Sequence, residues 1–445
     1  MKNKLTFKDR LQIKIKNQPK ITSKKTLIII FLLASIVFGS TFVYANSNNE
    51  KLKLNYSDNK LAQFTFVGDM MLGRSVKIKS ELDNYESVFK DVSYLWKDSQ
   101  YVSGNVESAL LDNPDDFQKS DKEIHLYAET KVSNLLKKNG FTMANLANNH
   151  LGDFGRDGVT STINAVKSAG LKYVGAGKNR DDAATYDIQE VNGIKVATLG
   201  ISDIVPKDFS ASRTEAGILS TMYPGYNKLV YEASQKADLV VVNLHWGVEY
   251  GVGQSEAQEK IAKSLIDAGA DVIIGSHPHV LQPIQTYKDG IIFYSMGNFV
   301  FDQGWTRTKD SMVLNYYINE KGEGTFEVVP VRIVNGYPVP TTNKFYQKRI
   351  FATLIKDLDK SKYEVTGDTL TLKNIIKTDI TKKENVEQTQ DGILQQQTQQ
   401  NNLEQTQQTQ QNNLEQTQQT QQNNLEQTQQ TQQNNLEQTQ QNTLQ

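Results

Sequence analysis

Cysteine is absent from the 445-residue sequence, which excludes disulfides, thiolate metal sites and cysteine nucleophiles. A chain without cysteine suits an extracellular location, where stray thiols oxidise. The formal net charge is only −1, so overall electrostatics give no reason to expect nucleic acid or a strongly acidic partner. Histidine is also scarce, with five residues in the chain. A metal site in this protein would have to use oxygen and imidazole ligands.

The first 45 residues combine a basic flank with an uncharged apolar run. Residues 1–25 carry nine Lys or Arg and one acid, Asp9. Residues 26–45, "TLIIIFLLASIVFGSTFVYA", carry no charge, and a helix of this length covers a bilayer core of ~30 Å. The sequence predicts one membrane span with a cytoplasmic N-terminus and an extracellular remainder. A retained signal anchor is favoured, and a signal peptide cut after Val43-Tyr44-Ala45 is the alternative.

The end of the chain is a glutamine-rich repeat. The unit "NNLEQTQQTQQ" begins at Asn401, Asn412 and Asn423, and a shortened copy begins at Asn434. Each unit contains a single leucine, which cannot bury enough surface to offset the entropy cost of ordering the chain. Residues 385–445 are therefore predicted to be a disordered spacer that carries no chemistry.

Residues 61–350 are predicted to form one α/β domain, with residues 46–60 as a linker. Short apolar runs typical of buried strands alternate with segments of helical spacing, and this alternation predicts layered sheets flanked by helices. The predicted strands cover 61–68, 141–146, 171–177, 194–201, 238–246, 271–276 and 290–299, and the predicted helices cover 157–169, 227–236 and 254–269. Hairpins are expected over 312–340, and no prediction is made for 351–384.

Several polar residues directly follow the predicted strands. The carboxyl ends of parallel strands meet at one edge of a sheet, where ligands usually bind, so these residues are expected to converge. Four of the five histidines occupy such positions. Oxygen and imidazole ligands suit one or two divalent ions of Mn, Zn or Fe. The candidate residues are Asp69, Asn105, Glu107, Asn149, His150, His245, His277 and His279.

Simpler roles are open for some of these residues. Asp153 either supports the site or caps the helix that is expected to begin near Asp157. His125 lies outside the strand-end pattern and is assigned a structural role. The remaining simple roles are a turn or cap at Asp69, an Asx turn at Asn149, a hydrogen-bonded strand-end side chain at His245 and a solvated carboxylate at Glu107.

Six motifs follow one another along the chain: "GDMMLGR" (68–74), "GNVES" (104–108), "NNH" (148–150), "HWGVEY" (245–250), "GSHPH" (275–279) and "YSMGNFVFDQ" (294–303). Their order resembles the CapA-type poly-γ-glutamate capsule biosynthesis family, within the calcineurin-like metallophosphoesterase superfamily. The resemblance covers about residues 62–305. It implies a metallophosphatase-like sandwich, tethered to the outer face of the cell membrane, that acts in capsule synthesis.

The resemblance also implies a role for each site residue. Asp69 and His279 would bind one metal ion, while Asn149, His245 and His277 would bind a second ion. Glu107 would bridge the two, because Asn105 stands where the superfamily has its usual aspartate. Met71 replaces a usual histidine ligand, which leaves one ion with fewer ligands. His150 would act as general acid or hydrogen-bond donor, and Asn105 and Asn298 would contact the substrate.

Two functions are compatible with this site. The first is a metal-dependent hydrolase or transferase that acts on an anionic surface polymer, most simply γ-linked polyglutamate. The second is a non-catalytic subunit of a polyglutamate synthase or exporter, with a vestigial or polymer-binding metal site. Met71 favours the non-catalytic subunit, and His150 favours the hydrolase or transferase. The hydrolase or transferase is the preferred hypothesis. The expected partners are the polymer and other membrane capsule-synthesis subunits, with no nucleic acid.

Overall fold

The computed structural model describes residues 60–81, 85 and 87–377, together with a few isolated positions before residue 60. Fifteen of the twenty residues of the predicted membrane span at 26–45 lie outside these residues, and the glutamine-rich repeat lies wholly outside them. Within the described part of the chain, no helix is both long enough and apolar enough to cross a membrane.

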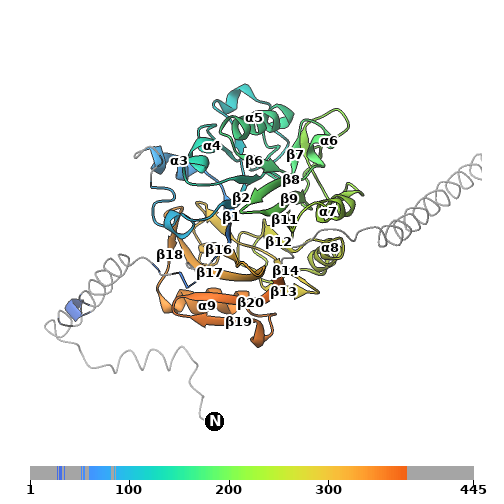
Figure 1. The fold of residues 1–445 in the computed structure, drawn as a ribbon. Helices are drawn as coiled ribbons and strands as arrows, with labels where there is room; N and C mark the ends of the chain where they lie inside the picture. The colour runs from blue at the N-terminus through green and yellow to red at the C-terminus, as the bar shows by residue number, and fades with distance from the viewer. Residues whose placement is uncertain are drawn as a thin grey trace, which may run out of the picture. The chain divides into compact units, whose positions relative to one another are not determined.

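The larger of the two main sheets has ten strands (Figure 1). They are β1 (Ala62–Met70), β2 (Tyr101–Val106), β5 (Met143–Asn145), β6 (Lys172–Val174), β15 (Asn298–Val300), β16 (Asp310–Ile318), β17 (Glu323–Val334), β18 (Tyr337–Pro340), β19 (Tyr363–Thr366) and β20 (Thr369–Lys377). Their order is β19-β20-β17-β16-β1-β2-β5-β6, with β15 beside β1 and β18 beside β17. Strands β15, β1, β2, β5 and β6 are parallel, and β16 to β20 add antiparallel hairpins.

The smaller main sheet has six strands in the order β13-β14-β12-β11-β9-β8. They are β8 (Asp187–Val191), β9 (Ile194–Ser202), β11 (Leu239–His245), β12 (Val272–Ser276), β13 (Ile284–Tyr287) and β14 (Gly290–Phe293). The four central strands are parallel. Two short ribbons pair β3 (Ala109–Leu110) with β4 (Tyr127–Ala128), and β7 (Ala176–Gly177) with β10 (Gly217–Ile218).

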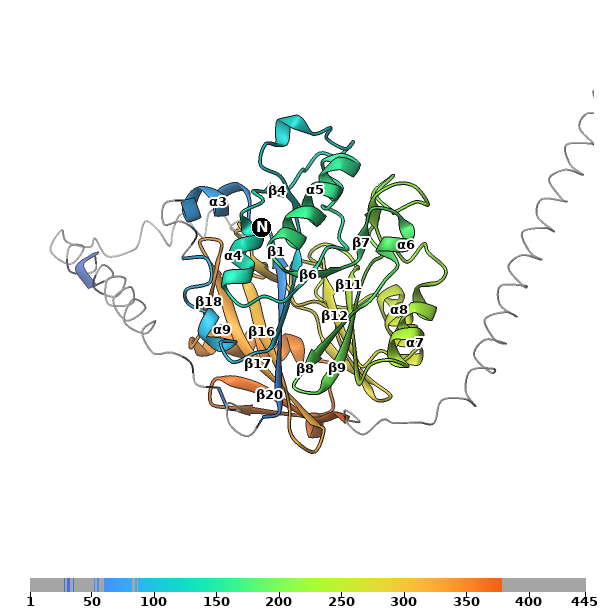
Figure 2. The same ribbon diagram turned by 45° about the horizontal axis from the view of Figure 1, so that its top comes forward.

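Helices cover the outer face of each sheet (Figure 2). Helices α4 (Val132–Lys138) and α5 (Gly155–Ser168) pack on the larger sheet. Helices α7 (Tyr226–Ser234) and α8 (Glu256–Asp267) pack on the smaller sheet. Two further helices are α3 (Arg74–Glu81) and α6 (Arg180–Ala183). The prediction of an α/β fold with helix-covered sheets is confirmed.

The continuous apolar runs in the sequence arise because the strands are buried on both faces. In β11, Leu239 and Val241 pack in the core between the two sheets. The intervening Val240 and Val242 face the opposite way and pack with helices α7 and α8. Side chains alternate between the two faces of a strand, so both sets of positions must be apolar when both faces are covered.

Residues 351–384, left unassigned from the sequence, contribute to the larger sheet as far as residue 377. Helix α9 (Lys344–Leu354) leads into this segment, and β20 pairs with β17. Leu370 and Leu372 of β20 pack with Ile350 and Phe351 of α9 in the core between the sheets. The described part of this segment therefore completes the domain core.

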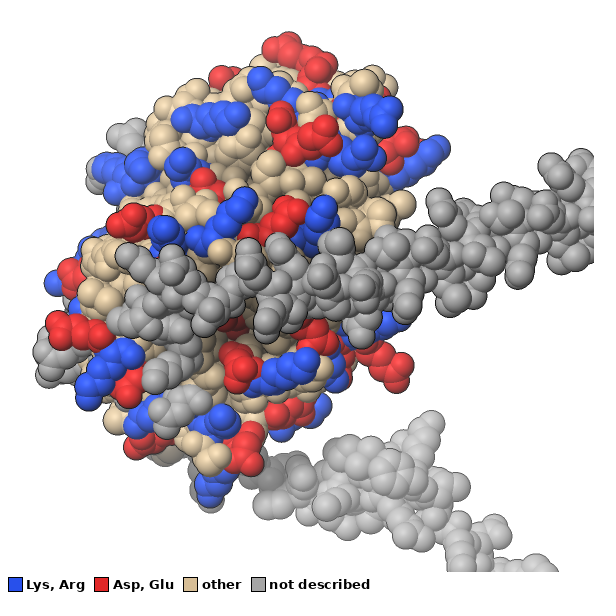
Figure 3. Space-filling view, turned by 45° about the vertical axis from the view of Figure 1, so that its right-hand side comes forward, with Lys and Arg blue, Asp and Glu red and all other residues tan. Residues whose placement is uncertain are grey.

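The strand register brings the candidate residues to one edge. Asp69 of β1 lies opposite Asn105 of β2 and Asn298 of β15. In the smaller sheet, His245 of β11 lies opposite Ser276 of β12, directly before the histidine-containing loop. The visible surface in Figure 3 mixes Lys and Arg with Asp and Glu. No charge of one sign dominates that face, in keeping with the near-zero net charge.

Candidate metal centre

Asp69 is fixed at the end of β1 by a close approach of backbone. A Cβ atom at Gly68 would lie 2.0 Å from the carbonyl oxygen of Gly297, so only glycine fits there. The Asp69 backbone N–H donates to that same oxygen at 3.0 Å. The carboxylate is fully buried and accepts from Asn105 Nδ2 at 2.8 Å and from the His277 backbone N–H at 3.2 Å.

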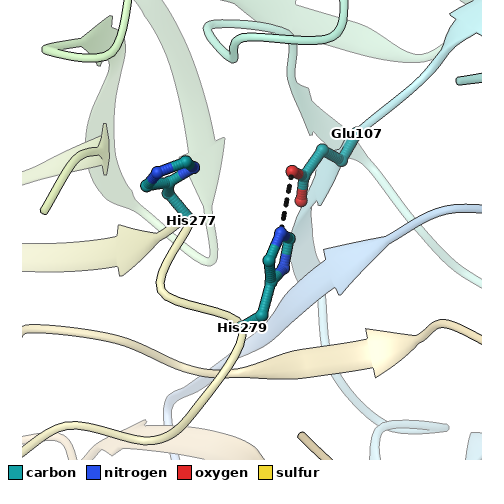
Figure 4. A group of neighbouring side chains, drawn as sticks. All are labelled: Glu107, His277 and His279. Carbon is teal, nitrogen blue, oxygen red and sulfur yellow. Dashed lines mark ion pairs between the residues drawn. The ribbon is translucent and has the colours of Figure 1, made fainter. Parts of the chain in front are cut away.

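His277 and His279 project from the loop that follows β12. Both have left-handed backbone conformations, with φ of 95° and 57°, which are strained for residues other than glycine. Both side chains are buried. His279 Nδ1 lies 2.9 Å from Asn298 Oδ1, an acceptor, so Nδ1 carries the proton. Nε2 of His279 lies 3.7 Å from Glu107 Oε1 (Figure 4).

Glu107 lies just beyond β2 and is fully buried among these side chains. Among the described residues, neither Glu107 Oε1 nor His277 Nδ1 has a hydrogen-bond partner. Glu107 Oε1 is 3.7 Å from His279 Nε2 and 3.9 Å from His245 Nε2, too far for hydrogen bonds. Ligand atoms that share one ion, each ~2.1 Å from it, lie roughly 3.4 Å apart. The spacing therefore fits metal coordination.

Two overlapping groups of side chains could hold an ion. One contains Glu107, His277 and His279, and the other contains Asp69, Glu107 and His245. Within each group the ligand atoms all lie within 4.8 Å of one another. Asn149 adjoins the second group, with Oδ1 2.9 Å from His245 Nε2. Glu107 belongs to both groups, as the resemblance implies for a bridging residue. The resemblance pairs His279 with Asp69, whereas in the structure His279 groups with His277, and Asp69 groups with His245.

The electrostatics of the site favour a cation. Burial raises the pKa of Glu107 well above its ordinary value, and the nearby Asp69 charge adds to this rise. Burial and the neighbouring imidazoles lower the pKa of His245 well below its ordinary value, and burial first of all lowers the pKa of His277 to about 3. These imidazoles are neutral at pH 7, the form that binds metals, and a divalent cation would offset two buried carboxyl groups.

His150 is held beside this cluster by Asp153 and Lys122. His150 Nδ1 lies 2.7 Å from Asp153 Oδ2, which also accepts from the Leu126 backbone N–H at 2.7 Å. Lys122 Nζ donates to Asp153 Oδ1 at 2.6 Å and to the Asn149 carbonyl oxygen at 2.7 Å. Burial lowers the pKa of His150, although Asp153 opposes that change. The ring is therefore neutral at pH 7, with its Nδ1–H directed at Asp153.

This arrangement decides between the two roles considered for Asp153. Helix α5 begins at Gly155, and its N-terminus has no side-chain cap. Asp153 supports His150 instead. Lys122 was missed by sequence reasoning because it follows no predicted strand and reaches the site from a distant loop. Nothing in the local sequence around Lys122 signals this contact.

Asn105 and Asn298 both hold other site residues in place. Asn105 Nδ2 donates to Asp69, while its Oδ1 accepts from Asn145 Nδ2 at 3.1 Å. Asn298 Oδ1 contacts His279, and its Nδ2 donates to Gln303 Oε1 at 2.9 Å. Both side chains are buried. The geometry gives both side chains a positioning role, and their predicted contact with substrate stays a prediction.

Two other positions are also placed clearly. Met71 is fully buried in the apolar core on the outer face of the larger sheet, among residues such as Val300. It therefore contributes no ligand to the site. His125 Nε2 lies 2.8 Å from the Ser120 carbonyl oxygen, and its ring packs against Phe154. These contacts agree with the structural role assigned to His125 from the sequence.

Known proteins are similar in sequence to most of this chain. The family model described as "Bacterial capsule synthesis protein PGA_cap" matches residues 63–303. The capsule biosynthesis protein CapA of Bacillus anthracis is 44% identical, over 81% of this chain and 88% of the relative. The PGA biosynthesis protein CapA of Bacillus subtilis (strain 168) is 40% identical, over 80% of this chain and 93% of the relative.

A solved structure, the 5'-nucleotidase precursor from Thermus thermophilus, is similar over 65% of this chain and 58% of its own. Its TM-score is 0.37 at 17% identity, which carries no argument about function. The sequence comparisons are decisive, because the family model spans every motif at the strand ends and the two relatives each cover at least 80% of this chain. The chain belongs to the bacterial capsule synthesis protein family, as the motif order predicted.

Proposed function

We propose that this protein is a metal-dependent hydrolase or transferase that acts on γ-linked polyglutamate during capsule synthesis. The observation that carries the proposal is the buried Glu107 Oε1, which has no hydrogen-bond partner among the described residues and faces the imidazoles of His245 and His279. A buried carboxylate oxygen without a partner is costly in a folded protein, and a bound cation would remove that cost.

The residues divide into those that would hold metal and those that would handle protons. Asp69, Glu107, Asn149 and the three clustered histidines His245, His277 and His279 supply the ligands for one or two ions of Mn, Zn or Fe. When bound, such ions activate water and stabilise negative charge that develops on the substrate.

His150 is the proton-handling residue in this proposal. Asp153 accepts from Nδ1–H, so Nε2 of the neutral ring is the atom left to take a proton from the attacking water. The protonated ring would then give that proton to the leaving amine. Lys122 neutralises Asp153 and fixes the Asn149 carbonyl, so it holds His150 and Asn149 in one arrangement.

The location and partners of the protein belong to the same proposal. The basic flank and apolar run before residue 46 support a single-pass protein of the cell membrane with its domain outside. Its partners would be the anionic polymer and other membrane subunits of capsule synthesis. Both relatives named above are biosynthesis proteins by name, which supports the polymer as the ligand class.

The alternative is a non-catalytic subunit that binds polymer through the same metal site. Met71 supports it, because this residue stands where the resemblance implies a histidine ligand and is instead buried in the apolar core. The two functions share metal and polymer binding and differ only in turnover.

The deciding experiment loads the purified full chain with Mn, Zn or Fe and incubates it with poly-γ-glutamate. Elemental analysis gives the metal content, and chromatography gives the polymer length. We expect one or two equivalents of metal and shortened polymer, with cleavage lost in His150→Gln while metal is retained. Metal binding without cleavage in the wild type would select the non-catalytic alternative, and no metal binding would overturn both.

A further inference from the structure

Two aromatic rings beside the metal site are not used by the proposed chemistry. The ring of Tyr250 lies 6.2 Å from that of His279 and 4.6 Å from that of Trp305, measured between centroids. Trp305 is 56% exposed, whereas the other two tryptophans, Trp96 and Trp246, are buried. We call Tyr250 and Trp305 the aromatic rim. An exposed indole next to a functional site is typical of a ligand-binding surface.

The aromatic rim is connected to a metal-ligand candidate by hydrogen bonds. Gln303 Nε2 donates to the Tyr250 hydroxyl at 3.3 Å, and Gln303 Oε1 accepts from Asn298 Nδ2 at 2.9 Å. Asn298 in turn contacts His279 Nδ1 at 2.9 Å. The same side chains therefore orient both the phenol ring and the imidazole, so the rim keeps a fixed position relative to the site.

The loop that carries Tyr250 is also fixed by hydrogen bonds from buried glutamine side chains. Gln282 Nε2 donates to the carbonyl oxygens of Gly251 and Gly253 at 2.8 and 3.0 Å, and Gln258 Nε2 donates to Gln282 Oε1 at 3.1 Å. Both glutamines are at most 2% exposed. The rim is thus preorganised, and a ligand would bind it with little loss of loop entropy.

The groups around the rim indicate what it binds. The same loop exposes Val248 and Val252, at 67% and 47%. Arg307, two residues after Trp305, is also exposed. Flat apolar faces suit planar amides and methylene groups, and an exposed guanidinium suits carboxylates. A polymer that alternates amide planes with short methylene stretches and carries carboxylates offers all three features.

We propose that the aromatic rim is a subsite for repeat units of a γ-amide-linked polycarboxylate, next to the unit held at the metal site. This inference rests on the proposed function and adds the subsite that grips the polymer. Trp305 and Tyr250 contact the amide and methylene groups, Val248 and Val252 widen the apolar surface, and Arg307 pairs with carboxylates. The rim fixes the polymer and takes no part in bond cleavage.

The test is calorimetric titration of the metal-loaded full chain with poly-γ-glutamate. Trp305→Ala should weaken binding about tenfold, the size expected when an aromatic anchor is truncated. Trp305→Phe, which keeps a ring, should lose less affinity than Trp305→Ala. The matched control is Phe345→Ala, because Phe345 of α9 is a similarly exposed aromatic residue, at 68%. The metal content of all three variants should match that of the wild type.

Tryptophan fluorescence gives an independent readout, since Trp305 is the exposed indole of the three. Poly-γ-glutamate should protect part of the wild-type emission from acrylamide, and neutral dextran should not. Wild-type binding that is unchanged in Trp305→Ala would overturn the rim while the proposed function stands. Equal protection by dextran would overturn the assigned ligand chemistry. No polymer binding by the metal-loaded wild type would overturn the rim and the proposed polymer together.

Discussion

Glu107 and Glu327 are both buried glutamates associated with the larger sheet, but their surroundings are opposite. Glu327 Oε1 accepts from the Asn55 backbone N–H at 2.8 Å and from Thr369 Oγ1 at 3.0 Å, and its Oε2 accepts from the Tyr317 hydroxyl at 3.0 Å. Glu107 faces another carboxylate and has one oxygen without a partner among the described residues. Burial raises the pKa of both residues.

The comparison teaches that burial alone does not mark a functional carboxylate. At Glu327 the fold supplies a donor for each oxygen, so the residue ties the segment at Asn55 and strand β20 to β17. At Glu107 the fold supplies imidazoles and a second acid instead, at distances suited to an ion. Hydrogen-bond completion, rather than accessibility, separates a structural carboxylate from a ligand.

The largest effect is expected for Glu107→Gln. This change removes the negative charge of the residue that belongs to both metal groups. Affinity for each ion should fall by at least tenfold, because substitution of residues that only hydrogen-bond to metal ligands already costs about tenfold or more. Elemental analysis after metal loading and desalting measures it. Glu327→Gln is the matched control and should keep full metal content. Equal metal in the two variants would remove the distinction drawn between them.

A smaller effect is expected when ligands of only one group are removed. Asn149→Ala and His245→Ala should each lower the bound metal without unfolding the domain, because Glu107, His277 and His279 are left in place. Metal content and far-ultraviolet circular dichroism measure the two properties together. If both variants kept full metal content, the assignment of Asn149 and His245 as ligands would be wrong.

Metal removal should lower thermal stability by several degrees. A ligand at about 100 times its Kd stabilises the folded state by about 2.7 kcal/mol, and chelation removes that contribution. Differential scanning calorimetry with and without a chelator measures the change in Tm. Glu107→Gln should show little change on chelation, since it would already have lost its metal. An identical shift in that variant would place the bound metal elsewhere.

The smallest effect is expected at Glu327, and it depends on pH. The raised pKa means that the folded state holds the proton more tightly than the unfolded chain. The stabilising contribution is therefore complete below the unfolded pKa and is lost as pH rises through the folded pKa. Glu327→Gln should match the wild type in acid and exceed it near pH 7 by on the order of 1 kcal/mol.

Urea denaturation across this pH range measures the difference in the free energy of unfolding. Glu364→Gln is a suitable control, because Lys373 lowers the pKa of the exposed Glu364 and the stability change should be small and of opposite sign. A Glu327→Gln variant that is less stable at pH 7 would mean that the ionised form is needed for the hydrogen bonds to Tyr317 and Asn55.

The sequence predicted most of the sheet framework because buried parallel strands leave a strong local signal. The strand at 238–246 and the polar residue near its end could be predicted from the local sequence, without knowledge of distant contacts. Strand β19 gave no such signal, since three of its four residues, Glu364, Val365 and Thr366, are exposed. Its place depends on pairing with β20, which in turn pairs with β17.

The candidate site was predictable to the same extent. The pattern of parallel strand ends was sufficient to bring Asp69 and the histidines to one edge. Glu107 joins them just beyond β2, a strand that was not among those predicted from the sequence. The grouping of ligands was not predictable, because it depends on how the loop at 277–279 turns through two left-handed residues. Likewise, Lys122 reaches Asp153 across 31 positions of sequence, a contact that no local pattern encodes.

The two metal groups draw ligands from both sheets, since Asp69 and Glu107 come from the larger sheet and His245 and His277 from the smaller. Apolar packing in the core between the sheets is non-directional and tolerates small sliding movements, whereas coordination bonds do not. A bound ion would therefore act as a pin that sets the alignment of one sheet on the other. Metal affinity should in turn respond to substitutions deep in that core, at positions such as Phe326 that touch no ligand.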